Sequence, residues 1–270
     1  MEKDLKTAFE SAINGGKLIH CITNPISINQ CANGILALGS KPIMVEHPKE
    51  AAAITETAAS LLLNLGNITD VRIKSMQISA KTAYKKQIPV VLDAVGTACS
   101  ELRRKFALKL MRKYTPSVIK GNYSEIYALY RKTYKSRGVD ADDSLNENAV
   151  AKAAAELAEN FSCVVLASGK KDIVTDGKRC LYIQNGLEML SRITGTGCLL
   201  GAVTAVMLTG GDSFCGAAAA CGIMGISGEM AEKSYGNGSF LVGLMDALSN
   251  IDAEIFSERL RMEEIKWTDR

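Results

Sequence analysis

A glycine-rich turn late in the chain is the first feature that could bind and activate a substrate. Residues 194–198 read Thr-Gly-Thr-Gly-Cys, and an apolar run follows from Leu199. Glycines let the backbone approach a ligand, and a helix N-terminus offers unpaired N–H groups and a positive dipole end to an anion. The turn therefore predicts a phosphate site, with a plain turn before a helix as the alternative. Cys198 could act there as a base, as a nucleophile or only as a contact.

The spacing of this turn excludes two better-known phosphate motifs. It lacks the G-x-x-x-x-G-K-[ST] pattern of a P-loop. It also lies late in the chain without a strand–helix–strand unit after it, which argues against a dinucleotide-binding fingerprint.

Charged side chains stand where predicted strands end. Asp93 follows the apolar residues 90–92, and Lys120 and Glu125 flank the turn after the next apolar run. Ligands of open α/β sheets bind beyond the carboxyl ends of the strands. Phosphoryl transfer needs carboxylates, directly or through water, for Mg²⁺ and a cation for the phosphates. We therefore expect these residues at a phosphoryl-transfer site, with Ser168 offering a hydroxyl. For each residue alone, a helix cap or an ordinary turn is the alternative.

Short apolar runs alternate with longer segments of helical spacing through most of the chain. The strand-like runs are residues 18–23, 42–45, 60–64, 89–93, 117–120 and 163–167. The helical segments include residues 28–38, 71–86, 101–113 and 149–160. This alternation is typical of βαβ units. It predicts an α/β fold with a mostly parallel central sheet and helices on both faces.

The last hundred residues have a different pattern. Residues 172–176 and 179–184 flank a Gly-Lys turn and predict an antiparallel hairpin at the sheet edge. Helices are expected from there to the C-terminus, and residues 251–270 are amphipathic and charged. The polar residues 132–148 predict an exposed loop. No repeat or linker divides the chain, so residues 1–270 are predicted to form a single domain.

Composition and charge exclude several classes of function. The net charge is +3, from 32 basic and 29 acidic residues, and this balance does not favour a nucleic-acid partner. The uncharged region 193–211 has an unbroken apolar part of only residues 198–208, too short to cross a bilayer. Residues 1–10 lack the apolar core of a secretory signal. These features predict a cytoplasmic protein without membrane contact.

The cysteines and histidines do not form a recognisable site of their own. None of the eight cysteines lies in a C-x-x-C pair, and no histidine cluster stands beside them, which argues against structural zinc. We expect reduced thiols. His20 lies within an apolar strand and is expected to be a hydrogen-bonded core residue, so a Ser/His/Asp hydrolase is weakly supported.

Taken together in order, these motifs resemble the hydroxyethylthiazole kinase family, ribokinase-like enzymes of thiamine salvage. The similarity runs from about residue 18 to about residue 211, and its last segment is the most diagnostic. The matching segments are HCITN (20–24), ANGILALGSKPIM (32–44), NLG (64–66), VVLDAVG (90–96), KGNYSEI (120–126), ASGKKDIVTDG (167–177) and LSRITGTGC (190–198). The resemblance implies a ribokinase-like three-layer sandwich.

The resemblance also implies a reaction. ATP and 5-(2-hydroxyethyl)-4-methylthiazole would give the thiazole phosphate and ADP, with Mg²⁺. Related kinases of this fold carry an aspartate base in the Gly-x-Gly-Asp turn, and this branch carries a cysteine, here Cys198. Lys120, Ser168 and Gly197 match positions assigned to ATP binding.

The remaining implied positions concern the metal and the alcohol. Asp93 and Glu125 match acids near Mg²⁺ and phosphate. Gly195 would contact the substrate through its backbone, and Met44 and Asn24 match positions that line the thiazole pocket. The family assembles as homotrimers with the pocket between subunits, so a homotrimer is implied here.

Three residues depart from the family pattern. Lys120 replaces an arginine, Ser168 replaces a threonine, and Ala94 replaces a proline. Lysine keeps the charge but loses the two-pronged grip of a guanidinium on phosphate, so a weaker affinity for ATP is expected from an active enzyme. Three alternatives stay open. They are another ribokinase-like kinase for hydroxymethylpyrimidine, pyridoxal or a sugar, an ATP-dependent dehydratase of damaged nicotinamide cofactors, and a non-catalytic thiazole-binding protein.

Overall fold

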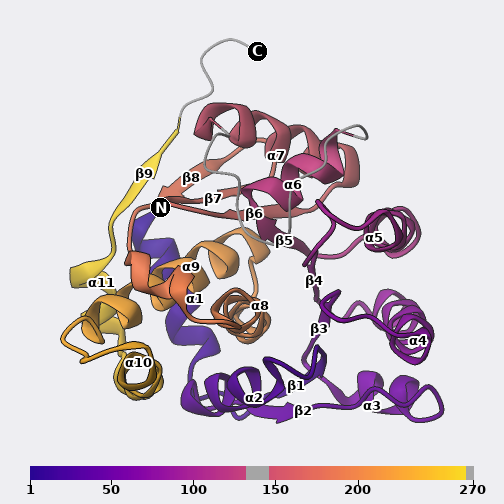
Figure 1. The fold of residues 1–270 in the computed structure, drawn as a ribbon, viewed down its shortest axis with the longest axis horizontal. Coiled ribbons are helices and arrows are strands. Elements are labelled where there is room, and N and C mark those ends of the chain that lie inside the picture. Colours follow the sequence, from indigo (N-terminus) through magenta and orange to yellow (C-terminus); the bar gives the residue numbers. More distant parts are fainter. Residues whose placement is uncertain (132–145, 266–270) are drawn as a thin grey trace.

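A mixed β-sheet forms the middle layer of the molecule (Figure 1). The computed structural model describes residues 1–131 and 146–265. Within them the strands are β1 (Leu18–Ile22), β2 (Lys41–Ile43), β3 (Ser60–Asn64), β4 (Val90–Asp93), β5 (Val118–Asn122), β6 (Val164–Ser168), β7 (Asp172–Thr175), β8 (Cys180–Ile183) and β9 (Met262–Glu264). The strand order is β2-β1-β3-β4-β5-β6-β7-β8-β9. The neighbours from β2 to β6 are parallel, and those from β6 to β9 are antiparallel.

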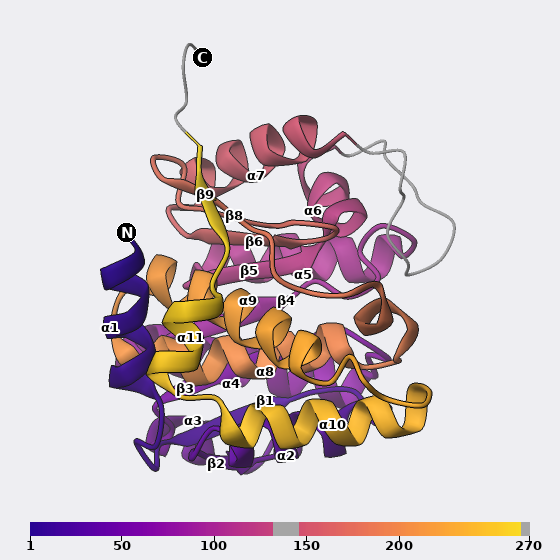
Figure 2. The same ribbon diagram turned by 90° about the vertical axis from the view of Figure 1, so that its left-hand side faces the viewer.

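Helices cover both faces of this sheet (Figures 1 and 2). One face carries α3 (Ala51–Thr57), α4 (Asp70–Lys86), α5 (Glu101–Tyr114), α6 (Tyr123–Tyr130) and α7 (Glu147–Phe161). The other carries α1 (Glu2–Ala12), α2 (Ile28–Ala37), α8 (Thr196–Met207), α9 (Ser213–Met230), α10 (Asn237–Asn250) and α11 (Ala253–Arg259). Two short 3₁₀ helices, Glu188–Arg192 and Leu208–Gly210, flank α8. The predicted three-layer α/β sandwich is confirmed.

The core consists of two apolar clusters, one on each face of the sheet. Successive side chains of a strand point to opposite faces, so Leu62 of β3 belongs to the cluster under α8 and α9, whereas Leu61 belongs to the cluster under α4 and α5. Val118 and Ile119 of β5 divide in the same way. This alternation decides which polar residues at the strand ends face α8.

The apolar run 198–208, which is too short to cross a bilayer, lies largely in α8, whose residues from Leu199 to its end are all buried. No helix among the described residues is both long and apolar enough to span a membrane. His20 is a hydrogen-bonded core residue as predicted, with Nδ1 3.0 Å from Thr55 Oγ1 and Nε2 2.9 Å from the Val45 carbonyl oxygen. All eight cysteines are free thiols.

The structure corrects three details at the ends of the chain and of the sheet. The last described segment is not wholly helical, because β9 pairs antiparallel with β8 and replaces the hairpin as the sheet edge. Residues 2–12 form a helix that the sequence did not predict. Glu147 and Asn148 belong to α7 rather than to the predicted loop, and Asn146 caps that helix. The rest of the loop, residues 132–145, lies outside the described residues, as do residues 266–270.

Candidate active site

The parallel register brings three polar residues into one row at the carboxyl edge of the sheet. Asn64 at the end of β3 pairs with Asp93 at the end of β4, and Asp93 pairs with Lys120 of β5. Each lies two residues after a side chain of the α8-facing cluster, namely Leu62, Val91 and Val118. The period of two along a strand therefore points all three toward the first turn of α8.

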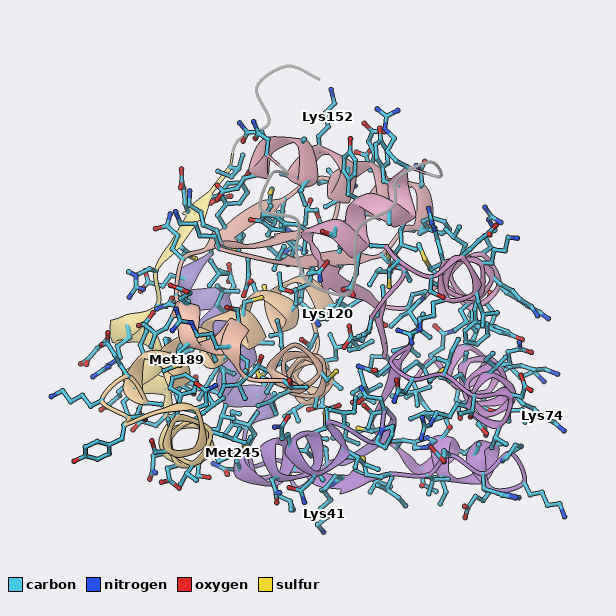
Figure 3. The ribbon with its side chains drawn as sticks, viewed as in Figure 1. Lys41, Lys74, Lys120, Lys152, Met189 and Met245 are labelled. Atoms are coloured by element: carbon cyan, nitrogen blue, oxygen red, sulfur yellow. The ribbon has the colours of Figure 1, made fainter. Side chains whose placement is uncertain are left out.

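Lys120 and Asp93 form an ion pair that is almost completely buried. Lys120 Nζ lies 3.1 Å from Asp93 Oδ1, and the two side chains are 3% and 0% exposed. Figure 3 shows Lys120 in the interior beside α8, whereas Lys41, Lys74 and Lys152 lie at the periphery. Burial acts to lower the pKa of Lys120, but the carboxylates of Asp93 and Glu125 outweigh it and raise that pKa. Burial raises the pKa of the Asp93 carboxyl against the opposing charge of Lys120.

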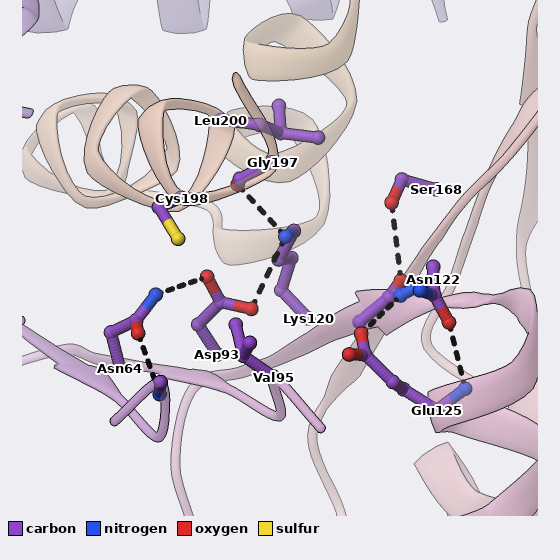
Figure 4. A network of polar contacts seen from close by, with 12 residues as sticks. Asn64, Asp93, Val95, Lys120, Asn122, Glu125, Ser168, Gly197, Cys198 and Leu200 are labelled. Carbon is purple, nitrogen blue, oxygen red and sulfur yellow. Dashed lines mark hydrogen bonds and ion pairs between the residues drawn. The ribbon is translucent and has the colours of Figure 1, made fainter. Parts of the chain in front are cut away.

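The same ammonium group also holds the start of α8. Lys120 Nζ donates to the Gly197 carbonyl oxygen at 2.8 Å (Figure 4). Lysine has three N–H donors, so two of them are used by Asp93 and Gly197. The sequence predicted Lys120 as a phosphate-binding cation, and the structure adds that it fixes the glycine turn to the strand ends.

Two asparagines connect Asp93 to Cys198. Asn64 Nδ2 donates to Asp93 Oδ2 at 2.7 Å. Asn24, which follows β1, donates from Nδ2 to Asn64 Oδ1 at 3.0 Å and to Cys198 Sγ at 3.2 Å. Because Cys198 follows Gly197 in the chain, these contacts close a ring. We call it the polar ring, and its members are Cys198, Asn24, Asn64, Asp93, Lys120 and Gly197.

The glycine turn itself requires a residue without a side chain. Gly195 is the N-cap of α8 with φ of 95°, a left-handed conformation that favours glycine. A Cβ atom there would lie 2.0 Å from Gln30 Oε1. No side chain caps the first turn of α8, whereas Thr69 and Ser100 cap α4 and α5. The first-turn N–H groups of α8 are therefore not occupied by a capping side chain, as an anion site requires.

Glu125 joins two other turns beside the polar ring. Its Oε1 accepts from the Gly96 N–H at 2.7 Å, and its Oε2 accepts from the Asn122 N–H at 2.8 Å. Asn122 caps α6 and receives the Glu125 N–H in return, which makes a reciprocal capping box. Burial raises the pKa of Glu125 to about 7, while the positive charge of Lys120 opposes that shift. A carboxyl with such a pKa changes charge near neutral pH.

The carboxylates fit a magnesium ion that reaches the protein mainly through water and phosphate. Each oxygen of Asp93 and Glu125 already accepts one hydrogen bond. A carboxylate oxygen has two lone pairs, so each retains one. Within residues 1–131 and 146–265, no three His, Cys, Asp or Glu side chains form a metal-binding group. Mg²⁺ usually keeps several waters and takes only one or two carboxylates, and the residues present match that pattern.

The predicted residues Ser168 and Met44 lie outside the polar ring. Ser168 ends β6 and is half-buried, with Oγ 3.4 Å from the Gly121 carbonyl oxygen. Met44 follows β2, is half-buried and packs against the α8-facing cluster. Gly197 is exposed at the first turn of α8. Asn24 belongs to the ring, Gly195 lies in the turn that leads into it, and Glu125 lies beside it, so Ser168 and Met44 stand farthest from the ring contacts.

Sequence reasoning assigned no role to Asn64, although the NLG segment contains it. The sequence did contain a sign of its role. Asn64 ends the strand next to that of Asp93, and its side chain points to the same face of the sheet. Gln30, whose Oε1 faces Gly195, carried no such signal: it is a half-buried residue in the first turn of α2 and meets the glycine turn only in the tertiary structure.

Known proteins with the same sequence pattern are kinases for hydroxyethylthiazole. Residues 13–254 match the hydroxyethylthiazole kinase family. Hydroxyethylthiazole kinase 2 of Clostridium botulinum (strain 657 / Type Ba4) is 45% identical over 252 residues, which cover 91% of this chain and 94% of the relative. A hydroxyethylthiazole kinase protein from Pyrococcus horikoshii OT3 has a TM-score of 0.90 and 29% identity, covering 98% of this chain and 100% of that chain.

A more distant structure supports the fold alone. A ribokinase-like superfamily protein from Enterococcus faecalis V583 has a TM-score of 0.64 at 11% identity, over 92% of this chain and 93% of that chain. The ribokinase-like architecture is therefore shared beyond the close relatives. With the family match spanning residues 13–254 and enclosing every residue of the polar ring, the chain belongs to the hydroxyethylthiazole kinase family.

Proposed function

We propose that this protein transfers the γ-phosphate of ATP to the primary hydroxyl of 5-(2-hydroxyethyl)-4-methylthiazole, giving the thiazole phosphate and ADP. The observation that carries the proposal is the placement of Cys198 at the uncapped first turn of α8, inside the segment that matches the family. The hydroxyl oxygen would form a bond to the γ-phosphorus as the bond to the β-phosphate oxygen breaks.

Cys198 would assist this transfer from the edge of the polar ring. Its sulfur accepts a hydrogen bond from Asn24 Nδ2 at 3.2 Å, so a thiol proton is not directed at that amide. As a thiolate the sulfur would take the proton of the alcohol, and as a thiol it would orient the alcohol while a phosphate oxygen takes the proton. Phosphoryl transfer depends mainly on positioning and charge stabilisation, so assistance suffices.

The nucleotide would lie along the carboxyl edge from β5 to β6. We assign Lys120, Ser168 and Gly197 to ATP, with the first-turn N–H groups of α8 facing the phosphates. Asp93 and Glu125 would hold the waters of Mg²⁺. When bound, this ion would neutralise phosphate charge and orient the triphosphate for in-line transfer.

The thiazole would lie next to Gly195, Asn24 and Met44. The segment that follows Asn24 and runs through α2 carries exposed apolar side chains, with Ile26 61% and Leu36 55% exposed. Large apolar side chains exposed in this way suit a subunit contact. It supports the proposal of a homotrimer that completes the pocket with a neighbouring subunit, which a Leu36→Lys variant would disrupt in sedimentation. We place this assembly in the cytoplasm, with no nucleic-acid or membrane partner.

The test is a substrate panel with Mg·ATP and the purified protein. Hydroxyethylthiazole, hydroxymethylpyrimidine, pyridoxal and ribose are each incubated, and ADP and the phosphorylated product are followed by mass spectrometry. Preferential formation of the thiazole phosphate is expected. Phosphorylation of another alcohol in preference would overturn the substrate assignment. Thiazole binding without any product would show a binding protein instead.

A further inference from the structure

The side chain of Asn64 is the point at which the two halves of the polar ring meet. It contacts Asp93 on one side and Asn24 on the other, at 2.7 Å and 3.0 Å. Its side chain is fully buried, like that of Asp93. A buried amide of this kind must have its hydrogen bonds satisfied, and here they join it to Asp93 and Asn24 of the ring and to the Gly66 N–H in the turn that follows β3.

The orientation of this amide is fixed by a backbone donor. Asn64 Oδ1 accepts from the Gly66 N–H at 2.9 Å, and an N–H can only donate. The oxygen therefore faces Gly66 and Asn24, and Nδ2 must face Asp93. Gly66 allows this approach, since a Cβ there would lie 2.9 Å from Asn64 Oδ1.

Asn24 is fixed by the same logic. Its Oδ1 accepts from the N–H groups of Ile26 and Ser27 at 3.1 Å and 3.2 Å. Its two Nδ2 hydrogens are then left for Asn64 Oδ1 and Cys198 Sγ. Two backbone-anchored amides thus set the direction of every donor from Cys198 to Asp93, and a fixed donor direction limits where the carboxylate and the sulfur can move.

We propose that Asn64 is a positioning residue for phosphoryl transfer, which holds the Asp93 carboxylate on Lys120 and, through Asn24, holds Cys198 at the start of α8. This inference rests on the proposed function. Asn64 touches no reacting atom in this scheme, so its loss slows the chemical step far more than it weakens the binding of either substrate. A small displacement of reacting groups lowers the rate by about 10- to 100-fold.

Asn64→Asp is the most specific test, because aspartate has nearly the same shape as asparagine but replaces the amide donor with an acceptor. The new carboxylate still accepts from Gly66 and Asn24, but it offers no donor to Asp93 and places an acceptor where Nδ2 lay 2.7 Å away. We expect kcat to fall by about 10- to 100-fold, with KM for ATP and for the thiazole within about 3-fold of wild type. Unchanged kcat would overturn the proposal.

Asn185→Asp provides the matched control. Asn185 is also a buried asparagine; it donates to the Arg259 carbonyl oxygen and the Glu229 carboxylate and accepts from the Arg261 N–H, and none of these partners belongs to the ring. Its variant should lower the melting temperature and leave kcat unchanged. If Asn64→Asp matches Asn185→Asp in both readouts, Asn64 has a structural role only and the proposal is wrong.

A second variant covers the case in which Asn64→Asp does not fold. Asn64→Ser removes the amide without adding a charge, and it should show the same fall in kcat with unchanged KM values. Failure of both variants to fold would also contradict the proposal, because loss of a positioning residue should leave an enzyme that is folded but has a lower kcat. Wild-type turnover of the thiazole is measured first. Its absence would overturn the proposed function, whereas normal turnover with normal variants would overturn only the role of Asn64.

Discussion

Lys120 and Asp93 form a buried ion pair, with Nζ and Oδ1 3.1 Å apart. Lys120 also ties Gly197 to the strand ends. Removing one partner of a buried pair leaves an uncompensated charge, which costs far more than an exposed pair contributes. The stability of the protein and the geometry of its site therefore depend on the same contact.

Lys120→Met is expected to lower the free energy of unfolding by about 3–5 kcal/mol at neutral pH, because it leaves the Asp93 carboxylate unpaired. Protonation would remove that charge, so the loss should shrink as the pH falls. Urea denaturation at pH 5 and pH 8 measures both effects. Lys152→Met, at an exposed position of α7, should change stability by less than about 0.5 kcal/mol.

The double variant Lys120→Met/Asp93→Leu distinguishes charge from packing. It removes both charges, so it should recover much of the stability that Lys120→Met loses while remaining inactive. A single Lys120→Met variant as stable as wild type at pH 8 would show that the pair does not matter for folding.

Cys198→Asp is expected to preserve or raise kcat. An aspartate oxygen can accept the Asn24 Nδ2 bond that Sγ accepts at 3.2 Å, and it is a base at neutral pH. A required general base contributes at least about 100-fold to the rate. Because the thiol only assists, Cys198→Ala should slow the reaction by less than that. Single-turnover measurements compare the two variants. A folded but inactive Cys198→Asp enzyme would contradict the assisting role of the thiol.

Gly195→Ala is expected to abolish most of the activity. A methyl group at φ of 95° is strained, and it would lie 2.0 Å from Gln30 Oε1. The added change Gln30→Ala should restore the steric part of the loss but not the strain of about 1 kcal/mol. Thermal unfolding and kcat are measured for both. Gly238→Ala is the control, because nothing lies within 4 Å of its Cβ position.

The pH dependence of kcat/KM should report Glu125, whose pKa is about 7. The carboxylate, present above that pH, is the form that would hold Mg²⁺ waters, so activity is expected to rise as the pH increases through about 7. Glu125→Gln should lose this inflection as well as activity. A wild-type profile that is flat from pH 6 to pH 8 would contradict the assignment.

The Glu125 carboxyl affects stability in the opposite direction: its contribution to folding falls as the pH rises, whereas activity is expected to increase. Burial raises its pKa from 4.5 to about 7, so the folded state binds the proton more tightly than the unfolded state between those values. Stability from Glu125 is therefore fully present below pH 4.5 and is lost as the pH rises through about 7. Proton uptake on folding at pH 6, measured by calorimetry in two buffers, should be smaller for Glu125→Gln than for wild type.

Much of the fold followed from the sequence because strand and helix patterns are local. Apolar runs and helical spacing located the parallel strands and α4, α5 and α7 to within a few residues. The strand β9 was missed because its residues Met262–Glu264 carry no strand pattern of their own. They are extended because β8 offers them an unpaired edge, which is a tertiary property.

For the candidate site too, some features could be predicted from the sequence and others could not. The types and strand-end positions of Asp93 and Lys120 were readable, because parallel strands end together. Their direct pairing depends on the register of β4 and β5, and the donation from Lys120 to Gly197 depends on how α8 lies across the sheet. Whether Met44 and Ser168 contact the substrates stays a prediction.

Because side chains alternate along β3, β4 and β5, the activity of this enzyme depends on the correct alignment of these strands. Asn64, Asp93 and Lys120 face α8 only while each strand keeps its pairing, because a slip by one residue would turn its polar side chain to the opposite face. Such a misfolded chain could retain its helices and much of its apolar burial. A single misaligned strand would abolish turnover but leave the circular dichroism spectrum nearly unchanged. Measuring kcat is therefore a more sensitive test of strand alignment than measuring that spectrum.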